Sequence, residues 1–348
     1  MTRVLLVVTE TDDFVNAHLF RRSTAAWCRA RGWALDTIAV EASERLEREL
    51  GPVEMPETGG QTRSLSRADG RRITELIDAA ADRGGEYTAA LFFGFSGYLL
   101  RFLGRGGARR VLVYDAHVLR GIEELARQGG AGAMARLLGG VEVVCPYHEE
   151  FGEGYEAIGI GKAQVRFCLQ PVDEGYLGGC SGYGDGDGYE GCIAVPGENF
   201  RDLEMLAEAV DGLRADVVVA AGGRELPELR GTGLRELPRL TYREYCGLIA
   251  RAGVVALPVQ GENAGLLSLS MAMTMGRAVV ITRTRFSEPY VEHKVSGLLV
   301  PPRDARALRK ALKRLVADAE QRARLGAAAR ERALPRQSFG ALLESLLG

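Results

Sequence analysis

The stretch from Arg251 to Asp304 constrains the fold more than any other part of the sequence. It begins with a short apolar run, Val254 to Pro258, of the length expected for a buried strand. A polar turn follows, and then a segment rich in Ala, Leu and Met, Leu266 to Met275, which favours a helix. Gly276 stands where such a helix would end, and Val279 to Ile281 is the next apolar run. The pattern predicts a βαβ unit whose turn offers free backbone N–H groups to an anion such as phosphate.

A longer motif closes this stretch. Residues Glu292 to Asp304 include Gly297-Leu298-Leu299-Val300-Pro301-Pro302. This run resembles one found in the donor half of the GT4 family of retaining glycosyltransferases. The resemblance implies an α/β protein of GT-B fold, in which two Rossmann-like domains face a cleft and the C-terminal helix crosses back to the first domain. We therefore expect an acceptor-binding domain at 1–170, a nucleotide-sugar-binding domain at 171–333 and the returning helix at 334–348.

Two glutamates of the family pattern are replaced in this chain. If Gly276 fixes the register, Met271 stands where the family has the glutamate that holds the donor ribose hydroxyls, and Asn263 takes the place of the first glutamate, beside Glu262. Loss of a charged acceptor weakens binding by about 1.5–3 kcal/mol unless another group replaces it. The residues that can replace it are Glu262, Glu288, Ser268 and Ser270.

Without such a replacement, the alternative is a catalytically silent GT-B protein that binds a partner enzyme or a nucleotide. A third hypothesis is a sugar-nucleotide epimerase, which the motif at 297–302 fits less well than it fits a GT4 glycosyltransferase.

The resemblance also implies a donor site that works without a metal ion, so cations and helix N–H groups must meet the charge of the leaving diphosphate. Arg201 and Arg224 each follow a predicted strand of the second domain, although both can equally be solvated surface residues. The donor is expected to be a UDP- or GDP-sugar, with no other cofactor. The predicted donor-binding residues are Arg201, Arg224, Glu262, Asn263, Ala264, Gly265, Leu266 and Met271.

Candidate acceptor-binding residues follow the first predicted strand, residues 3–8. The loop from Thr9 to Phe14 places three carboxylates beside an aromatic ring, which would suit a cationic acceptor. Helix capping by Asp12 or Asp13 is the alternative. We expect a small polar acceptor, cationic or a thiol, as used in natural-product biosynthesis. The predicted acceptor-binding residues are Thr9, Asp12, Asp13, Phe14 and Phe95, the last of which follows the strand at 89–93.

His117 is the candidate catalytic residue. It follows the predicted strand Val111 to Tyr114 by a few residues, and ligands of parallel sheets gather beyond the carboxyl ends of the strands. A lone histidine is more often structural than catalytic. The resemblance implies that His117 orients the donor sugar and stabilises developing charge.

Composition excludes several other classes of protein. The net charge of −2 gives no general attraction for nucleic acid, and no apolar run approaches the roughly 18 residues of a membrane span.

The six cysteines include no C-x-x-C pair, so we expect reduced thiols in a cytoplasmic protein. Only Cys180, inside the glycine-rich run Gly175 to Gly191, is expected to be exposed. That run also holds Asp185-Gly186-Asp187, which we reject as a metal motif because no apolar strand precedes it. Oligomeric state is left open, a homo-oligomer included.

Overall fold

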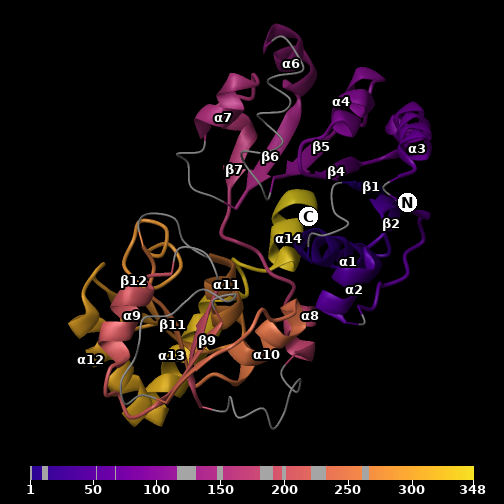
Figure 1. The fold of residues 1–348 in the computed structure, drawn as a ribbon. Coiled ribbons are helices and arrows are strands. Elements are labelled where there is room, and N and C mark those ends of the chain that lie inside the picture. Colours follow the sequence, from indigo (N-terminus) through magenta and orange to yellow (C-terminus); the bar gives the residue numbers. More distant parts are fainter. Residues whose placement is uncertain are drawn as a thin grey trace. The chain divides into compact units, whose positions relative to one another are not determined.

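The chain forms two compact units, each built on its own sheet (Figure 1). In the computed structural model, the described residues are 2–9, 15–51, 53–66, 68–115, 131–146, 152–180, 191–197, 201–220, 233–260 and 266–348. Unit 1 takes its described residues from Met1–Arg48, Pro52–Cys168 and Leu342–Gly348, and unit 2 from Glu49–Gly51 and Leu169–Ala341.

The sheet of unit 1 has the strand order β3-β2-β1-β4-β5-β6-β7, and every neighbouring pair is parallel. Val4 of β1 is in register with Leu35 of β2 on one side and with Ala89 of β4 on the other. Chain order therefore reverses between β1 and β4, which is where doubly wound sheets bind ligands. The strands are β1 (Arg3–Val8), β2 (Ala34–Val40), β3 (Thr62–Leu65), β4 (Ala89–Phe93), β5 (Val111–Tyr114), β6 (Val141–Cys145) and β7 (Val165–Phe167).

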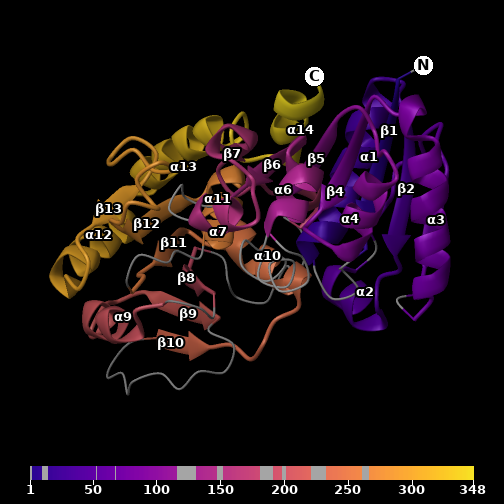
Figure 2. The same ribbon diagram turned by 90° about the horizontal axis from the view of Figure 1, so that it is seen from above.

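Helices cover both faces of this sheet because its strands alternate apolar side chains between the two faces (Figure 2). Phe92 points to one face and meets Phe102 of α4, with ring centroids 5.4 Å apart. Phe93 points to the other face and meets Phe20 of α1 at 5.6 Å. The helices of unit 1 are α1 (Val15–Ala30), α2 (Glu44–Leu50, whose last residues count with unit 2), α3 (Gly70–Asp82), α4 (Gly97–Gly104), α6 (Ala131–Leu138), α7 (Gly152–Ala157) and the 3-10 turns η1 (Gly84–Glu86) and η3 (Lys162–Gln164).

The sheet of unit 2 has the order β10-β9-β8-β11-β12-β13, again all parallel. Its helices α9 and α12 pack on one face through a core that includes Leu206, Leu308 and Leu312. The strands are β8 (Ile193–Pro196), β9 (Asp216–Ala220), β10 (Gly233–Glu236), β11 (Val254–Leu257), β12 (Ala278–Thr282) and β13 (Leu298–Val300). The helices are α8 (Glu174–Gly179), α9 (Leu203–Val210), α10 (Tyr242–Arg251), α11 (Leu266–Thr274), α12 (Ala305–Ala317) and α13 (Ala319–Ala333).

The C-terminal helix α14 (Phe339–Leu347) returns to the first unit, as the GT-B pattern predicts. Residues from Leu342 onward count with unit 1, where Trp27 Nε1 donates to Glu344 Oε2 at 3.1 Å. Just before this helix, Val172 and Ser338 form a parallel bridge within unit 2, so the two connecting segments run side by side there.

The structure corrects two local expectations. The glycine-rich run at 175–191, whose composition favours a flexible loop, begins as helix α8, because the Asp173 side chain accepts a hydrogen bond from the Tyr176 N–H and caps it. Cys180 ends that helix and is only 2% exposed, whereas we expected it in solvent. Asp185 and Asp187 lie outside the described residues. No helix in the described ranges combines the length and apolar character needed to cross a bilayer.

Candidate functional site

The carboxyl ends of β8 and β11 define the candidate site of unit 2. These strands are neighbours at the point where chain order reverses, so the segments that follow them lie at one edge of the sheet. Gly197 and Arg201 follow β8, and helix α11 begins after β11 at Leu266. A further bridge between Arg201 and Val259 joins the two segments directly.

Arg201 is buried at this edge, with 4% of its surface exposed. Its Nε donates to the carbonyl oxygen of Pro196 at 2.8 Å, and its Nη2 donates to Ser268 Oγ at 3.2 Å. The first contact fixes the side chain to the end of β8 and the second to the first turn of α11. The guanidinium is therefore held against the amino end of that helix, where backbone N–H groups and the helix dipole also favour an anion.

Gly197 leaves room for this arginine. Its φ is +112°, in the region that favours glycine, and a Cβ at this position would lie 2.5 Å from Arg201 Nη2. The sequence thus needs glycine here for two independent reasons, backbone conformation and space for the guanidinium.

Helix α10 packs two tyrosines along α11. Tyr245 OH and Ser268 Oγ are 2.6 Å apart, and Tyr242 OH lies 3.9 Å from the sulfur of Met271. A capping box sets the start of α10: the Glu244 N–H donates to Thr241 Oγ1, and the Thr241 N–H donates to Glu244 Oε2.

Burial lowers the pKa of Arg201, and the neighbouring Tyr245 opposes that shift. An arginine begins from so high a pKa that it stays charged at neutral pH despite such a shift. The described part of the chain holds no cluster of three His, Cys, Asp or Glu side chains suited to a metal ion. Arg201, the Ser268 hydroxyl and the N–H groups of α11 together can bind an anion.

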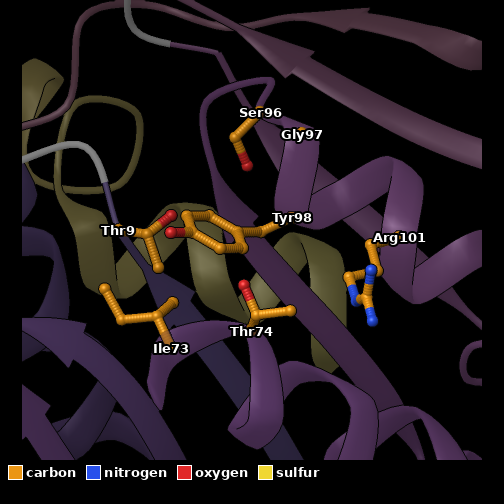
Figure 3. Close-up of a pocket in the computed structure, with 7 residues that line it drawn as sticks. All are labelled: Thr9, Ile73, Thr74, Ser96, Gly97, Tyr98 and Arg101. Atoms are coloured by element: carbon orange, nitrogen blue, oxygen red, sulfur yellow. The ribbon is translucent and has the colours of Figure 1, made fainter. Parts of the chain in front are cut away.

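Unit 1 contains a pocket at the corresponding edge of its own sheet, with a volume of about 520 Å³. Thr9 enters it from the end of β1, and Ser96 from the end of β4, the two strands between which chain order reverses. Figure 3 shows the hydroxyl groups of Thr9, Thr74 and Ser96 turned toward the Tyr98 ring. The described residues that line it are Thr9, Ile73, Thr74, Ser96, Gly97, Tyr98 and Arg101.

The cation in this lining is already paired. Arg101 donates to both carboxylate oxygens of Asp78, at 2.5 and 2.6 Å, and these bonds lower the pKa of Asp78. Hydroxyl groups and an aromatic ring thus dominate the described lining, a composition that suits an uncharged polar ligand with several hydroxyls.

The end of β5 is anchored by a buried pair. Asp115 is 2% exposed and accepts a hydrogen bond of 2.7 Å from Tyr155 OH. Burial beside this carboxylate raises the pKa of Tyr155, so its hydroxyl keeps its proton. The candidate catalytic residue His117 follows two positions later and lies outside the described residues.

Comparison with solved structures identifies the fold. A glycosyltransferase from Rickettsia africae aligns with 99% of this chain and 97% of its own, with TM-score 0.69 and 12% identity. HepE from Anabaena, crystallised with UDP-glucose, aligns over 99% and 98% with TM-score 0.62 and 14% identity. Sucrose-phosphate synthase from Thermosynechococcus elongatus aligns over 100% and 98% with TM-score 0.61 and 16% identity.

The protein has the GT-B fold.

Sequence comparison finds a family match in the second half of this GT-B chain. Residues 191–318 match the family described as "Glycosyl transferases group 1". A D-inositol 3-phosphate glycosyltransferase from Saccharomonospora viridis is 37% identical over 156 residues, which is 40% of this chain. The match spans 36% of that relative's length. The similarity in sequence is thus with GT4-type glycosyltransferases, and the matched family region includes the Arg201 site.

The structure places some of the predicted donor residues. Arg201 and Leu266 lie at the carboxyl edge of the second sheet, as described above. Met271 is completely buried, and Glu288, one candidate to replace the family glutamate, is paired with Arg283 at 2.6 Å on the surface. The predicted residues outside the described ranges are Arg224, Glu262, Asn263, Ala264 and Gly265.

Among the predicted acceptor residues, Thr9 lines the pocket of unit 1. Phe95 is 2% exposed and packs on Tyr155 with ring centroids 6.1 Å apart, so any part it plays in binding acts through the packing of this loop. Asp12, Asp13 and Phe14 lie outside the described residues.

Sequence reasoning missed Tyr98, Arg101 and Tyr245 and assigned a different role to Ser268. The sequence did contain a signal for Tyr98. The short segment Gly94 to Gly97 follows the carboxyl end of the predicted strand at 89–93, where ligands gather, and Tyr98 comes directly after it. Nothing local marks Tyr245 or Ser268, which are 23 positions apart and meet only through helix packing.

Proposed function

We propose that this GT-B protein is a glycosyltransferase that moves a sugar from a nucleotide-sugar donor to a small polar acceptor, without a metal ion and with retention at the anomeric carbon. The observation that carries the proposal is the buried guanidinium of Arg201 against the amino end of α11, 3.2 Å from Ser268 Oγ. A leaving diphosphate needs this combination of fixed cation and helix N–H groups when no metal neutralises it.

Unit 2 would bind the donor in this proposal. Its Arg201 site lies at the switch point of a Rossmann-like sheet and inside the stretch that matches group 1 glycosyltransferases. HepE was crystallised with UDP and with UDP-glucose, which makes UDP the first nucleotide to test and GDP the second.

Unit 1 would bind the acceptor in the pocket beside Tyr98. Since Arg101 is paired with Asp78, the described lining favours a polyhydroxy compound over a strongly charged one. A cationic or thiol acceptor rests on the acidic residues at 10–13, so an amino sugar and a thiol belong in the same acceptor screen as a polyol and D-inositol 3-phosphate, the substrate in the name of the Saccharomonospora relative.

His117 would orient the donor sugar and stabilise charge as the bond to the diphosphate breaks. The Asp115–Tyr155 pair supports this role by fixing the strand end just before it. The six cysteines, all of them in the described ranges, form no disulfide bond, which supports a reducing compartment such as the cytoplasm.

The test is a thermal-shift screen of the full chain with UDP, GDP, dTDP and ADP in the presence of EDTA, followed by a transfer assay with the matching UDP- or GDP-sugar. A nucleotide at 100 times its Kd adds about 2.7 kcal/mol to the free energy of unfolding, which is easily seen. The proposal predicts that one nucleotide raises the melting temperature and that its sugar is transferred. Absence of any shift at millimolar nucleotide would contradict it.

A silent GT-B subunit is the second candidate, favoured by Met271. This side chain is 0% exposed and packs beside Tyr242, so it offers no carboxylate to a ribose. Nucleotide binding without transfer to any acceptor, together with activation of a partner enzyme, would support this alternative.

A further inference from the structure

The Arg201 site includes a tyrosine, Tyr245, to which the proposed function assigns no role, and a serine, Ser268, whose proton it does not place. Ser268 is 5% exposed and contacts both Arg201 Nη2, at 3.2 Å, and Tyr245 OH, at 2.6 Å. The three groups come from the end of β8, from α11 and from α10, so the chain brings them together from three separate elements.

The hydrogen-bond pattern restricts the direction of the protons. Arginine only donates, so Ser268 Oγ must accept from Arg201. If Tyr245 also donates to Oγ, both lone pairs of the serine are used, and its own proton is left to donate to another acceptor. An oxygen of an anion bound at the amino end of α11 is such an acceptor.

We propose that Ser268 and Tyr245 are positioning residues for Arg201, which fix its guanidinium and turn the Ser268 hydroxyl proton toward the diphosphate of the donor. This inference rests on the proposed function, because it assumes that the anion at this edge is a diphosphate. It adds Tyr245 and assigns Ser268 a role as a donor to phosphate oxygen, in place of the role of ribose acceptor.

A purely structural tie between β8 and α11 would use the same contacts, so the test compares ligands that differ in phosphate. Inorganic pyrophosphate probes the anion site whatever base the donor carries, and UDP and uridine probe it with and without phosphate. Affinities of the full chain are measured by calorimetry for the wild type, Ser268→Ala and Tyr245→Phe.

We expect Ser268→Ala to weaken pyrophosphate and UDP by about 10-fold or more and Tyr245→Phe by about 3- to 10-fold, in line with the loss of one charge-assisted or one neutral hydrogen bond. Uridine affinity should change less than about twofold, because uridine has no phosphate to sense these bonds. Ser268→Thr retains the hydroxyl and should restore most of the lost affinity.

Two control variants match these changes. Tyr242→Phe removes a hydroxyl from the same helix, one that contacts the Met271 sulfur. Thr274→Val removes a buried hydroxyl of α11 for which the described residues provide no hydrogen-bond partner. Neither control should alter pyrophosphate affinity by more than about twofold.

Coupling to Arg201 gives the second readout. In an Arg201→Met background, Ser268→Ala should weaken pyrophosphate binding clearly less than it does in the wild type, since the part of its effect that acts by positioning the guanidinium is already lost and only its own bond to the anion remains. Equal losses for uridine and pyrophosphate, or additive losses in the double variant, would overturn the positioning role while leaving the proposed function intact. Failure of the folded wild type to bind either pyrophosphate or UDP would overturn both.

Discussion

The close approach of Gly197 to Arg201 allows one substitution to be followed quantitatively. Gly197→Ala places a Cβ 2.5 Å from Nη2 and 3.0 Å from Cζ of Arg201, whereas ordinary contacts begin near 3.4 Å. The guanidinium must therefore move by several tenths of an ångström or more, which strains or breaks its 3.2 Å bond to Ser268. A hydrogen bond of a charged group contributes about 1.5–3 kcal/mol.

Backbone strain adds to this effect and can be measured separately. Gly197 has φ +112°, and a non-glycine residue in such a conformation costs about 1–3 kcal/mol. Gly106 has a similar φ of +105°, and nothing lies within 4 Å of the Cβ it would gain. Gly106→Ala is thus a matched control that reports the strain without the collision.

The assay is urea unfolding of both variants, together with calorimetry of UDP and pyrophosphate. Gly106→Ala should lose about 1–3 kcal/mol of unfolding free energy and no ligand affinity. Gly197→Ala should lose about 1.5–3 kcal/mol more than the control, and its diphosphate affinity should fall at least 10-fold. Equal destabilisation in the two variants, with unchanged affinity for diphosphate, would refute the argument that Gly197 exists to accommodate Arg201.

Three further predictions follow from the site and its surroundings. His117→Ala should abolish sugar transfer while leaving the nucleotide-induced rise in melting temperature intact, and loss of nucleotide binding would instead indicate a structural role. Met271→Glu should raise the preference for UDP over 2′-deoxy-UDP by about 10-fold if position 271 faces the ribose when donor is bound, whereas an unchanged ratio measured by calorimetry would place the ribose elsewhere. Burial, with a smaller contribution from Arg21, lowers the pKa of His18 to about 4. Since the unfolded chain then binds more protons near pH 5, stability should fall by about 2 kcal/mol between pH 7.5 and pH 5, and urea unfolding of His18→Gln should lack that part of the loss.

Much of the fold was readable from local patterns. The strand at Val254, the helix that starts at Leu266 and the capping box at Thr241 all follow from apolar run length, helix propensity and hydrogen-bonding side chains at fixed spacing. The start of the glycine-rich run at 175–191 is helical and not a loop, because one short-range bond, from the Tyr176 N–H to Asp173, begins α8 despite the glycines.

Strand β3 has no such local signal in the sequence. Residues 62–65 of β3 are partly exposed and mostly polar, so they carry no apolar run. They become a strand because β2 presents an open edge with unpaired backbone groups, with which Thr62 to Leu65 pair in parallel.

For the candidate site, too, some features follow from the sequence alone and others only from the tertiary structure. By itself the sequence predicted a phosphate-binding turn before α11, a strand before Arg201 and, with Gly276 fixing the register, Met271 in the place of the family glutamate, because each is a statement about neighbours along the chain. Only the tertiary structure decided that Arg201, 67 positions from Ser268, binds its hydroxyl and that Tyr245 completes the group. Strand order sets those encounters: the parallel pairing of β8 with β11 brings distant loops to one edge, and hydrogen bonds of about 3 Å form only between groups that packing has already aligned.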